Sequence, residues 1–167
     1  MKYCPECAAP LAPAVIDNVD RLVCESENCG FIQWNNPIPV VAALVECEGK
    51  YIIANNVKWP ANIFSLITGY LEAGETPEQA VLREVAEELG LAGSIKHFLG
   101  HYSLFARNQL ILCFEITATG VIKTNHELAE LKLLTPEELA EYNFAPLNIT
   151  QQIVRQWAKR YLIPQEN

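Results

Sequence analysis

Three carboxylates lie within one short segment, residues 83–88, whose sequence is Arg-Glu-Val-Ala-Glu-Glu. In an α-helix, residues three and four positions apart share a face, so Glu84 would lie beside both Glu87 and Glu88. Arg83 can pair with Glu87 at the i,i+4 spacing, but one arginine cannot neutralise three carboxylates. A divalent cation can, because Mg²⁺ takes oxygen ligands and is typically held by a few carboxylates together with substrate phosphates. A solvated acidic face is the alternative interpretation.

The flanking residues have uses that suit such a site. Gly69 lets the backbone come close to a metal or a phosphate. Glu75 lies just before the segment and can reach Arg83, which would fix the preceding loop to the helix. We therefore expect the chemistry to involve the whole stretch from Gly69 onward.

A helix over residues 76–89 must position these carboxylates. Thr76 is a suitable N-cap, Gln79 completes a capping box, and Pro77 occupies the first helical position. Gly90 would end the helix in the left-handed conformation. Apolar runs and helical periodicity predict the other elements, which are strands at 40–45, 51–54, 64–67, 95–105, 109–118 and 131–134 and a last helix at about 149–162. This alternation indicates an α/β fold with a mixed sheet.

The stretch 69–91 resembles the Nudix box. It reads Gly69, five residues, Glu75, seven residues, Arg-Glu-Val at 83–85, one residue, Glu-Glu at 87–88, one residue, then Gly-Leu at 90–91, so that every fixed position of the signature is matched without a gap. The resemblance extends over about 37–145. It implies a Nudix-type α/β/α sandwich, which we assign to residues 37–167, and hydrolysis of a nucleoside diphosphate linked to another moiety with Mg²⁺ or Mn²⁺.

The resemblance also implies roles for individual residues. The metal ligands would be Glu84, Glu87 and Glu88, with the Gly69 carbonyl as a possible further ligand, while Glu75 and Arg83 would organise the loop and the helix. The general base would be Glu88, Glu87 or an acid from the segment 125–130. Within that segment Glu130 is the first choice and Glu127 the alternative. Both of these could equally be exposed loop acids.

Four cysteines form two pairs, separated by sixteen residues, near the start of the chain: Cys4, Cys7, Cys24 and Cys29. Two short thiolate pairs joined by a loop can supply the tetrahedral coordination that Zn²⁺ prefers. We therefore predict a structural zinc ribbon over residues 1–34. The alternative is a small hairpin with reduced or disulfide-linked cysteines.

A zinc ribbon followed by a Nudix domain is similar to ADP-ribose and FAD pyrophosphatases of bacteria and plants. This similarity implies a small nucleotide substrate and release of a nucleoside monophosphate. The NADH pyrophosphatases are also similar, but they carry the array Ser-Gln-Pro-Trp-Pro-Phe-Pro-Ser downstream of the box, which is not found in this sequence. A house-cleaning triphosphate pyrophosphohydrolase and a non-enzymatic ligand-sensing module are the remaining alternatives.

Two aromatic residues upstream of the box are candidates for substrate binding. Trp59 lies in a predicted loop, and Phe64 lies in the predicted strand that leads to Gly69. Either ring could stack on a nucleobase, and either could instead pack within the loop or the core. We expect substrate contacts from both.

The composition excludes several other functions. The 167-residue chain has a net charge of −8 and a pI of about 4.9, which disfavours nucleic-acid binding. No stretch approaches the roughly 20 apolar residues of a membrane helix, and the first residues lack an apolar signal-peptide core. We expect a cytoplasmic protein without a membrane partner. Because relatives are often dimers, a homodimer is possible.

Overall fold

The computed structural model describes residues 1–162, which form two compact units, Met1–Pro37 and a second unit beginning at Ile38. The two prolines among residues 35–39 predict a linker between the units, since proline cannot donate to a strand ladder. Ile38 and Pro39 instead belong to a strand of the second unit, opposite Gln109 and Leu110. Proline is tolerated at the start of a strand, where its missing N–H need not break the ladder.

The first unit is a small antiparallel sheet. Its strands are β1 (Leu11–Ile16), β2 (Val19–Cys24) and β3 (Ile32–Gln33), in the order β1-β2-β3. Asp17 and Asn18 join β1 to β2 with φ values of 52° and 62°. Two consecutive left-handed residues form the type of tight turn that matches the twist of a hairpin, and Asp and Asn tolerate it well.

The second unit contains a mixed six-stranded sheet. Its strands are β4 (Ile38–Cys47), β5 (Lys50–Asn56), β6 (Ile67–Tyr70), β7 (Ala92–Leu104), β8 (Gln109–Thr119) and β9 (Leu128–Leu134). The order is β7-β8-β4-β5-β9, and β6 also pairs with β4. Only β4 and β8 are parallel among these pairs. The long strand β4 pairs with β6 over residues 40–43 and with β5 over residues 45–47.

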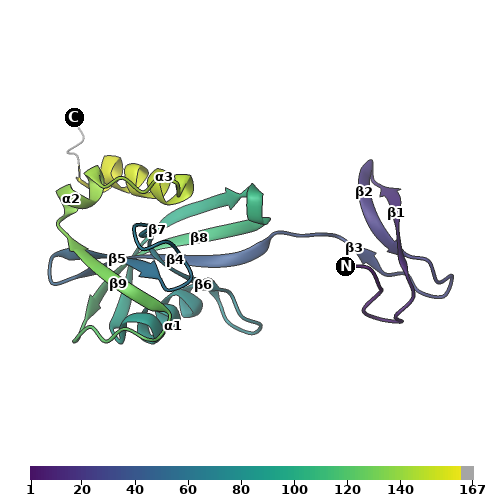
Figure 1. The fold of residues 1–167 in the computed structure, drawn as a ribbon, viewed down its shortest axis with the longest axis horizontal. Helices are drawn as coiled ribbons and strands as arrows, with labels where there is room; N and C mark the ends of the chain where they lie inside the picture. The colour runs from purple at the N-terminus through teal and green to yellow at the C-terminus, as the bar shows by residue number, and fades with distance from the viewer. Residues whose placement is uncertain (163–167) are drawn as a thin grey trace. The chain divides into compact units, whose positions relative to one another are not determined.

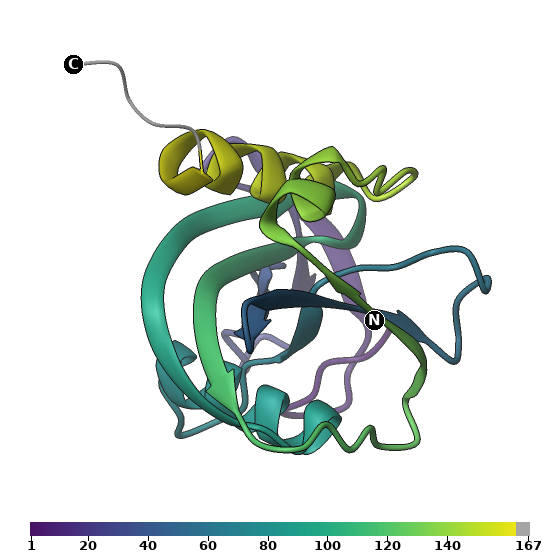
Figure 2. The ribbon, with the colours of Figure 1, turned by 90° about the vertical axis from the view of Figure 1, so that its left-hand side faces the viewer.

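Helices cover both faces of this sheet (Figures 1 and 2). The helix α1 (Pro77–Leu89) lies on one face, and α2 (Pro136–Glu141) and α3 (Asn148–Trp157) lie on the other. Successive residues of β4 alternate between the two cores, as the period of a strand requires: Val40, Ala42 and Leu44 face α3, whereas Val41, Ala43 and Val45 face α1. The predicted α/β/α sandwich with a mixed sheet is thereby confirmed.

Two predicted elements differ in detail. The strand expected at 64–67 lies at 67–70 instead, because Ser65 makes only an isolated bridge with Ala54 before β6 pairs with β4. The last helix reaches Leu162 as expected, but its final turn, η2 (Ala158–Leu162), is π-helical. Within residues 1–162, no helix is both long and apolar enough to span a bilayer.

Candidate functional site

The helix α1 begins and ends as its sequence predicts. The Thr76 hydroxyl accepts a hydrogen bond from the Gln79 N–H at 3.3 Å, and the Gln79 side chain accepts one from the Thr76 N–H at 2.8 Å. Gly90 ends the helix with φ of 68°, in the left-handed region that suits glycine. These caps fix which turn of the helix carries the carboxylates, and so they set the position of the site.

Arg83 ties the loop before α1 to the helix. Its Nη2 and Nε atoms donate to the two oxygens of Glu75 at 2.7 and 3.1 Å, and Nη2 also donates to the carbonyl of Tyr70 at 3.2 Å. Glu75 also accepts from the N–H of Glu72 at 2.7 Å. The hydrogen bonds from Arg83, together with that N–H, lower the pKa of Glu75. The predicted contact between Glu75 and Arg83 is therefore present, and it is a bidentate ion pair.

The same guanidinium also holds two carboxylates of the helix. Its Nη1 lies 2.7 Å from Oε1 of Glu84 and 3.2 Å from Oε2 of Glu87, the latter at the predicted i,i+4 spacing. Glu84 is largely shielded from solvent, whereas the Glu87 side chain is 57% exposed. Arg83 thus compensates part of the negative charge, and among residues 1–162 no cation pairs with Glu88.

Gly69 lies directly against Glu84. A Cβ atom at position 69 would overlap the Glu84 carboxylate, both its Oε1 and its Cδ. The absence of a side chain at Gly69 therefore makes room for this carboxylate at the end of β6. A side chain at position 69 would therefore displace the Glu84 carboxylate from this place. The backbone itself does not call for glycine, since Gly69 does not have a positive φ.

Glu88 is the most strongly perturbed carboxylate of the helix. Its side chain is buried, with only 6% of the residue exposed. Burial, followed by the negative charges of Glu84, Glu127 and Glu87, raises its pKa to about 8. Burial also raises the pKa of Glu84, against the hydrogen bond from Arg83. A cation placed among these groups would lower both pKa values, because it stabilises the ionised carboxylates.

The segment after β8 brings a fourth carboxylate to this cluster. Lys123 and Asn125 donate their N–H groups to the carbonyls of Leu89 and Glu88, at 2.8 and 3.2 Å, so the segment covers the last turn of α1. Glu127 follows directly, and its charge contributes to the raised pKa values of Glu84 and Glu88.

Glu130 occupies a different position. It lies in β9 opposite Asn55 of β5 and is exposed. It does not contribute to the pKa shifts of the helix carboxylates, unlike Glu127. Of the two downstream acids considered from the sequence, the structure thus brings Glu127 toward the site.

The loop that carries Trp59 is attached to this same segment. The Val57 N–H donates to the Glu127 carbonyl at 2.8 Å. Asn55, which is buried, donates its side-chain amide to the carbonyls of Pro60 and Ile63 at 2.8 and 2.7 Å and so holds the loop in shape. Trp59 is partly exposed on this loop. The sequence analysis did not single out Asn55. An asparagine at the end of an apolar run was a usable signal, because a polar side chain that becomes buried there needs hydrogen-bond partners.

Phe64 lies in the core on the α3 side of the sheet, with 3% of its surface exposed. The ammonium group of Lys132 lies 4.2 Å from the centre of its ring. A nucleobase could reach this ring only by displacing packed side chains, so we leave Phe64 out of the proposed substrate site.

The four cysteines of the first unit converge. The Sγ atoms of Cys4, Cys7, Cys24 and Cys29 all lie within 4.8 Å of one another, and two pairs are separated by 3.7 and 3.4 Å. Tetrahedral Zn²⁺ with Zn–S distances of about 2.3 Å requires sulfur atoms about 3.8 Å apart. The donor set therefore fits Zn²⁺. In contrast, Cys47 and Cys113 are buried in the core of the second unit.

The carboxylate cluster also fits a divalent cation. Here the supporting observation is the burial of Glu88 among other carboxylates, and not a tight gathering of ligand atoms as in the cysteines. In the part of the chain that the structure describes, its ligand atoms are not gathered as tightly as those of the cysteines. Glu84 and Glu87 instead share the Nη1 atom of Arg83, and Glu88 is buried with no cation beside it. A buried carboxylate among three others is costly unless it is protonated or pairs with a cation.

The α/β/α sandwich and the glutamates of its loop and α1 helix are the features expected of a Nudix hydrolase. Comparison with known proteins tests that expectation. A family model described as the NUDIX domain matches residues 36–157. The chain therefore belongs to the NUDIX family, whose members hydrolyse phosphoric anhydride bonds.

Two curated relatives show how far the similarity of sequence extends. The NAD-capped RNA hydrolase NudC of Photobacterium profundum is 29% identical over 126 residues, which cover 75% of this chain and 46% of that protein. The human mitochondrial NAD(P)H pyrophosphatase NUDT13 is 26% identical over 133 residues, 78% of this chain and 37% of that protein. The chain thus spans about half the length, or less, of these relatives.

Solved structures agree on the fold. The crystal structure of a NUDIX hydrolase from Nitrosomonas europaea has a TM-score of 0.83 at 22% identity and covers 97% of this chain and 93% of that one. The solution structure of the E. coli ORF135 protein has a TM-score of 0.60 at 26% identity, with 78% and 96% covered.

Proposed function

We propose that this protein hydrolyses the pyrophosphate of a nicotinamide dinucleotide, releasing AMP and nicotinamide mononucleotide. The observation that carries this proposal is the cluster of Glu84, Glu87, Glu88 and Glu127, in which burial and mutual repulsion raise the pKa of Glu88 to about 8. Such a cluster suits divalent cations and a phosphate substrate, because the cation bridges two negatively charged partners.

The choice of substrate differs from the first choice made from the sequence, which was ADP-ribose or FAD. The relatives are described as acting on NAD-capped RNA and on NAD(P)H, and this favours the alternative. The downstream array of Pro, Trp and Phe that accompanies NADH pyrophosphatases is absent from this sequence. Recognition of nicotinamide must therefore rest on other residues, and Trp59 is our candidate, since its loop is bonded to Glu127 through Val57.

In this hydrolysis the carboxylates would have two roles, holding a cation and accepting a proton. Glu84, Glu87 and Glu88 would hold a divalent cation such as Mg²⁺ or Mn²⁺, with the Gly69 carbonyl as a further ligand; when bound, the cation neutralises the pyrophosphate charge. Arg83 and Glu75 keep the ligands and the loop in place. Water then attacks one phosphorus atom, the bridging P–O bond breaks, and a carboxylate takes the proton of the water.

We assign that proton to Glu127 in preference to Glu130. Glu127 is close enough to Glu88 to raise its pKa, and it lies on a segment bonded to the end of α1. Loss of a general base typically lowers kcat by about 10²–10⁴-fold. Glu127→Gln should show such a loss, whereas Glu130→Gln, which changes an exposed acid of β9, should retain the wild-type kcat. The opposite pattern would assign the role to Glu130.

The substrate is tested by assaying the purified protein with Mg²⁺ against NADH, NAD⁺, ADP-ribose, FAD, nucleoside triphosphates and an RNA carrying a 5′-NAD cap. The proposal expects the highest kcat/KM for the nicotinamide dinucleotides. A preference for the capped RNA would assign the same pyrophosphate cleavage to a longer substrate, despite the net charge of −8. Turnover of ADP-ribose or of triphosphates alone would contradict the proposal.

We also propose that the first unit binds one structural Zn²⁺ through its four cysteines. Four sulfur ligands leave no open position for a substrate, so this ion would contribute to folding and not to catalysis. The first unit contributes only Cys4 to the buried hydrophobic residues of the described chain. A metal is a common way to stabilise a unit of this size.

A further inference from the structure

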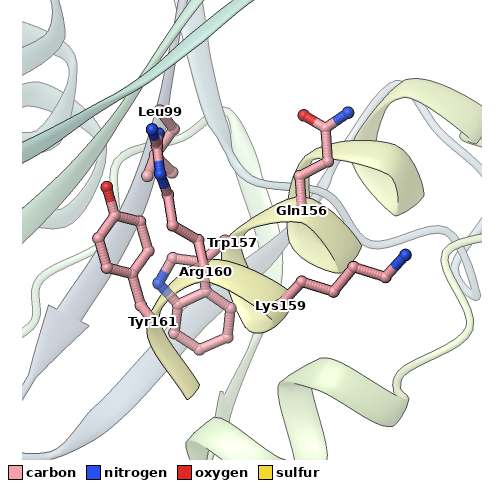
Figure 3. A pocket seen from close by; sticks show the side chains of 6 residues that line it. All are labelled: Leu99, Gln156, Trp157, Lys159, Arg160 and Tyr161. Atoms are coloured by element: carbon pink, nitrogen blue, oxygen red, sulfur yellow. The ribbon is translucent and has the colours of Figure 1, made fainter. Parts of the chain in front are cut away.

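A cavity of about 320 Å³ opens beside α3 and η2 (Figure 3). The residues that line it are Leu99, Gln156, Trp157, Lys159, Arg160 and Tyr161. The polar ends of Gln156, Lys159 and Arg160 point in different directions, so they do not converge on one ligand (Figure 3). A buried polar side chain whose hydrogen bonds do converge lies instead at the end of β5.

Asn55 holds the loop that joins β5 to β6. It is 2% exposed, and its Nδ2 group donates to the carbonyls of Pro60 and Ile63 at 2.8 and 2.7 Å. Both N–H donors of one amide are thereby used on the same loop. At the base of the loop, Ala54 and Ser65 exchange two backbone hydrogen bonds of 2.9 Å. These bonds favour one loop conformation, because a buried amide is costly to leave unpaired.

The first part of this loop is a tight turn that carries Trp59. The Trp59 N–H donates to the Asn56 carbonyl at 2.8 Å, and the Lys58 N–H donates to the Asn56 side-chain oxygen at 3.0 Å. Asparagine at the start of a turn favours such a bond to the backbone two residues on. Asn56 therefore shapes the turn that presents Trp59, while Asn55 anchors the remainder of the loop.

The same loop is bonded to the segment that carries Glu127. The Val57 N–H donates to the Glu127 carbonyl at 2.8 Å. The pairing of β5 with β9 shifts by one residue beside Asn55, because Ala129 is an extra residue of β9. Bulges of this kind bend a strand and re-aim its side chains, often next to active sites. The shift makes Glu127, rather than Leu128, the partner of Val57.

We propose that Asn55 is a positioning residue that fixes the substrate-binding loop and the proton acceptor together. Its amide holds the loop that presents Trp59, and this loop holds Glu127 through Val57. Because a misplacement of about 1 Å can cost roughly 10²-fold in rate, one buried amide can influence both substrate binding and catalysis. The inference rests on the proposed function for the roles of Trp59 and Glu127, but not on the choice of dinucleotide.

Asn55→Asp tests this role with little change of shape, because it replaces the donating NH₂ group by an oxygen that faces two carbonyl oxygens. We expect a raised KM and a kcat lower by about tenfold or more, measured with whichever substrate the wild type hydrolyses best. Asn55→Ala takes its place if the aspartate variant does not fold. Ser65→Ala is the control, since it removes another buried hydrogen bond, to Thr150 at 3.0 Å, and should leave both constants unchanged.

Double variants separate positioning from a general loss of stability. In a Glu127→Gln background, Asn55→Asp should lower kcat little further, and in a Trp59→Ala background it should raise KM little further, because residues that act as a unit are not additive. Where the single variant has an effect of its own, additive losses would overturn the proposal. Wild-type constants in a folded Asn55→Asp protein, or equal losses in Ser65→Ala, would overturn it as well.

The indole N–H signal of Trp59 in an NMR spectrum reports on the loop without any substrate. Trp59→Phe assigns this signal among the three tryptophans. The signal should shift in Asn55→Asp and in the uncharged Asn55→Ala, and it should stay in place in Ser65→Ala. An unmoved signal would overturn the positioning of the loop by Asn55. A shifted signal together with a wild-type kcat for Glu127→Gln would instead refute the general base of the proposed function.

Discussion

The carboxylate of Glu84 occupies the space that a side chain would fill at Gly69. This contact joins the end of β6 to the first glutamate of the α1 cluster, and any side chain at position 69 would displace that glutamate from its place.

Gly69→Ala should displace the Glu84 carboxylate and weaken metal-dependent activity. Changes that disturb the orientation of metal ligands typically cost about 10–100-fold in affinity or activity. The loss should appear as a higher Mg²⁺ concentration for half-maximal rate, measured by steady-state kinetics. Gly30→Ala is the control, since nothing lies within 4 Å of a Cβ at that position. Equal Mg²⁺ dependence in wild type and Gly69→Ala would show that Glu84 need not sit there.

Glu88 should make the metal-free protein less stable as pH rises. Its pKa is about 8 in the folded protein, well above the value of about 4.3 in an unfolded chain. Between these values the folded state binds more protons than the unfolded state, so the free energy of unfolding falls with increasing pH, by an amount on the order of a few kcal/mol.

The difference between wild type and Glu88→Gln isolates this effect. Thermal unfolding without Mg²⁺ at several pH values should show the variant gaining stability over the wild type from about pH 5 to pH 8. Added Mg²⁺ should stabilise the wild type at pH 8 and have little effect on the variant. Parallel pH profiles of the two proteins would mean that Glu88 has an ordinary pKa.

Glu115 is a buried carboxylate of the opposite kind. Burial raises its pKa, but hydrogen bonds from His97, Tyr51 and Lys96 outweigh burial, and the pKa is lowered overall. Its contribution to stability is therefore present above the unfolded pKa and is lost as pH falls through the folded pKa.

Glu115→Gln should consequently destabilise the protein at neutral pH, by roughly 1.5–3 kcal/mol. Urea unfolding at pH 7 measures this loss, and kcat of the folded variant serves as the check on activity, which should not change. Without metal at neutral pH, Glu88→Gln is thus expected to raise the free energy of unfolding, whereas Glu115→Gln is expected to lower it. Stabilisation by Glu115→Gln would contradict the hydrogen-bond network described here.

The zinc site gives a prediction that does not involve activity. The purified protein should contain about one zinc ion per chain, because four thiolates complete its coordination. Cys24→Ser should lose most of this zinc, as measured by mass spectrometry of the metal content, whereas Cys113→Ser changes a thiol of the second unit and should not. Equal zinc in both variants, or none in the wild type, would rule the site out.

Local sequence patterns were enough to predict α1 and its internal contacts. The capping box, the glycine at the end of the helix and the pairing of Arg83 with Glu75 and Glu87 all depend on fixed spacings along the chain. The four cysteines were likewise found from spacing alone. Such features need no knowledge of the tertiary fold.

Features that depend on distant segments were harder to predict. Glu127 and Glu130 look alike in sequence, and only the bonds of Lys123 and Asn125 to the end of α1 show which of them approaches the cluster. Phe64 could not be placed in the core until α2 and α3 were known to cover that face of the sheet. The cavity beside α3, lined otherwise by residues of α3 and η2, likewise depends on β7, which supplies Leu99.

The rate of AMP release from NADH by wild type and by Glu88→Gln, each with and without Mg²⁺, tests whether the α1 carboxylates hold the catalytic metal. We predict rapid release by the wild type only with Mg²⁺. For a folded Glu88→Gln protein, we predict a rate lower by about 10²-fold or more under the same conditions. Equal rates for the two proteins with Mg²⁺ would contradict the assignment of the α1 carboxylates as the catalytic metal site.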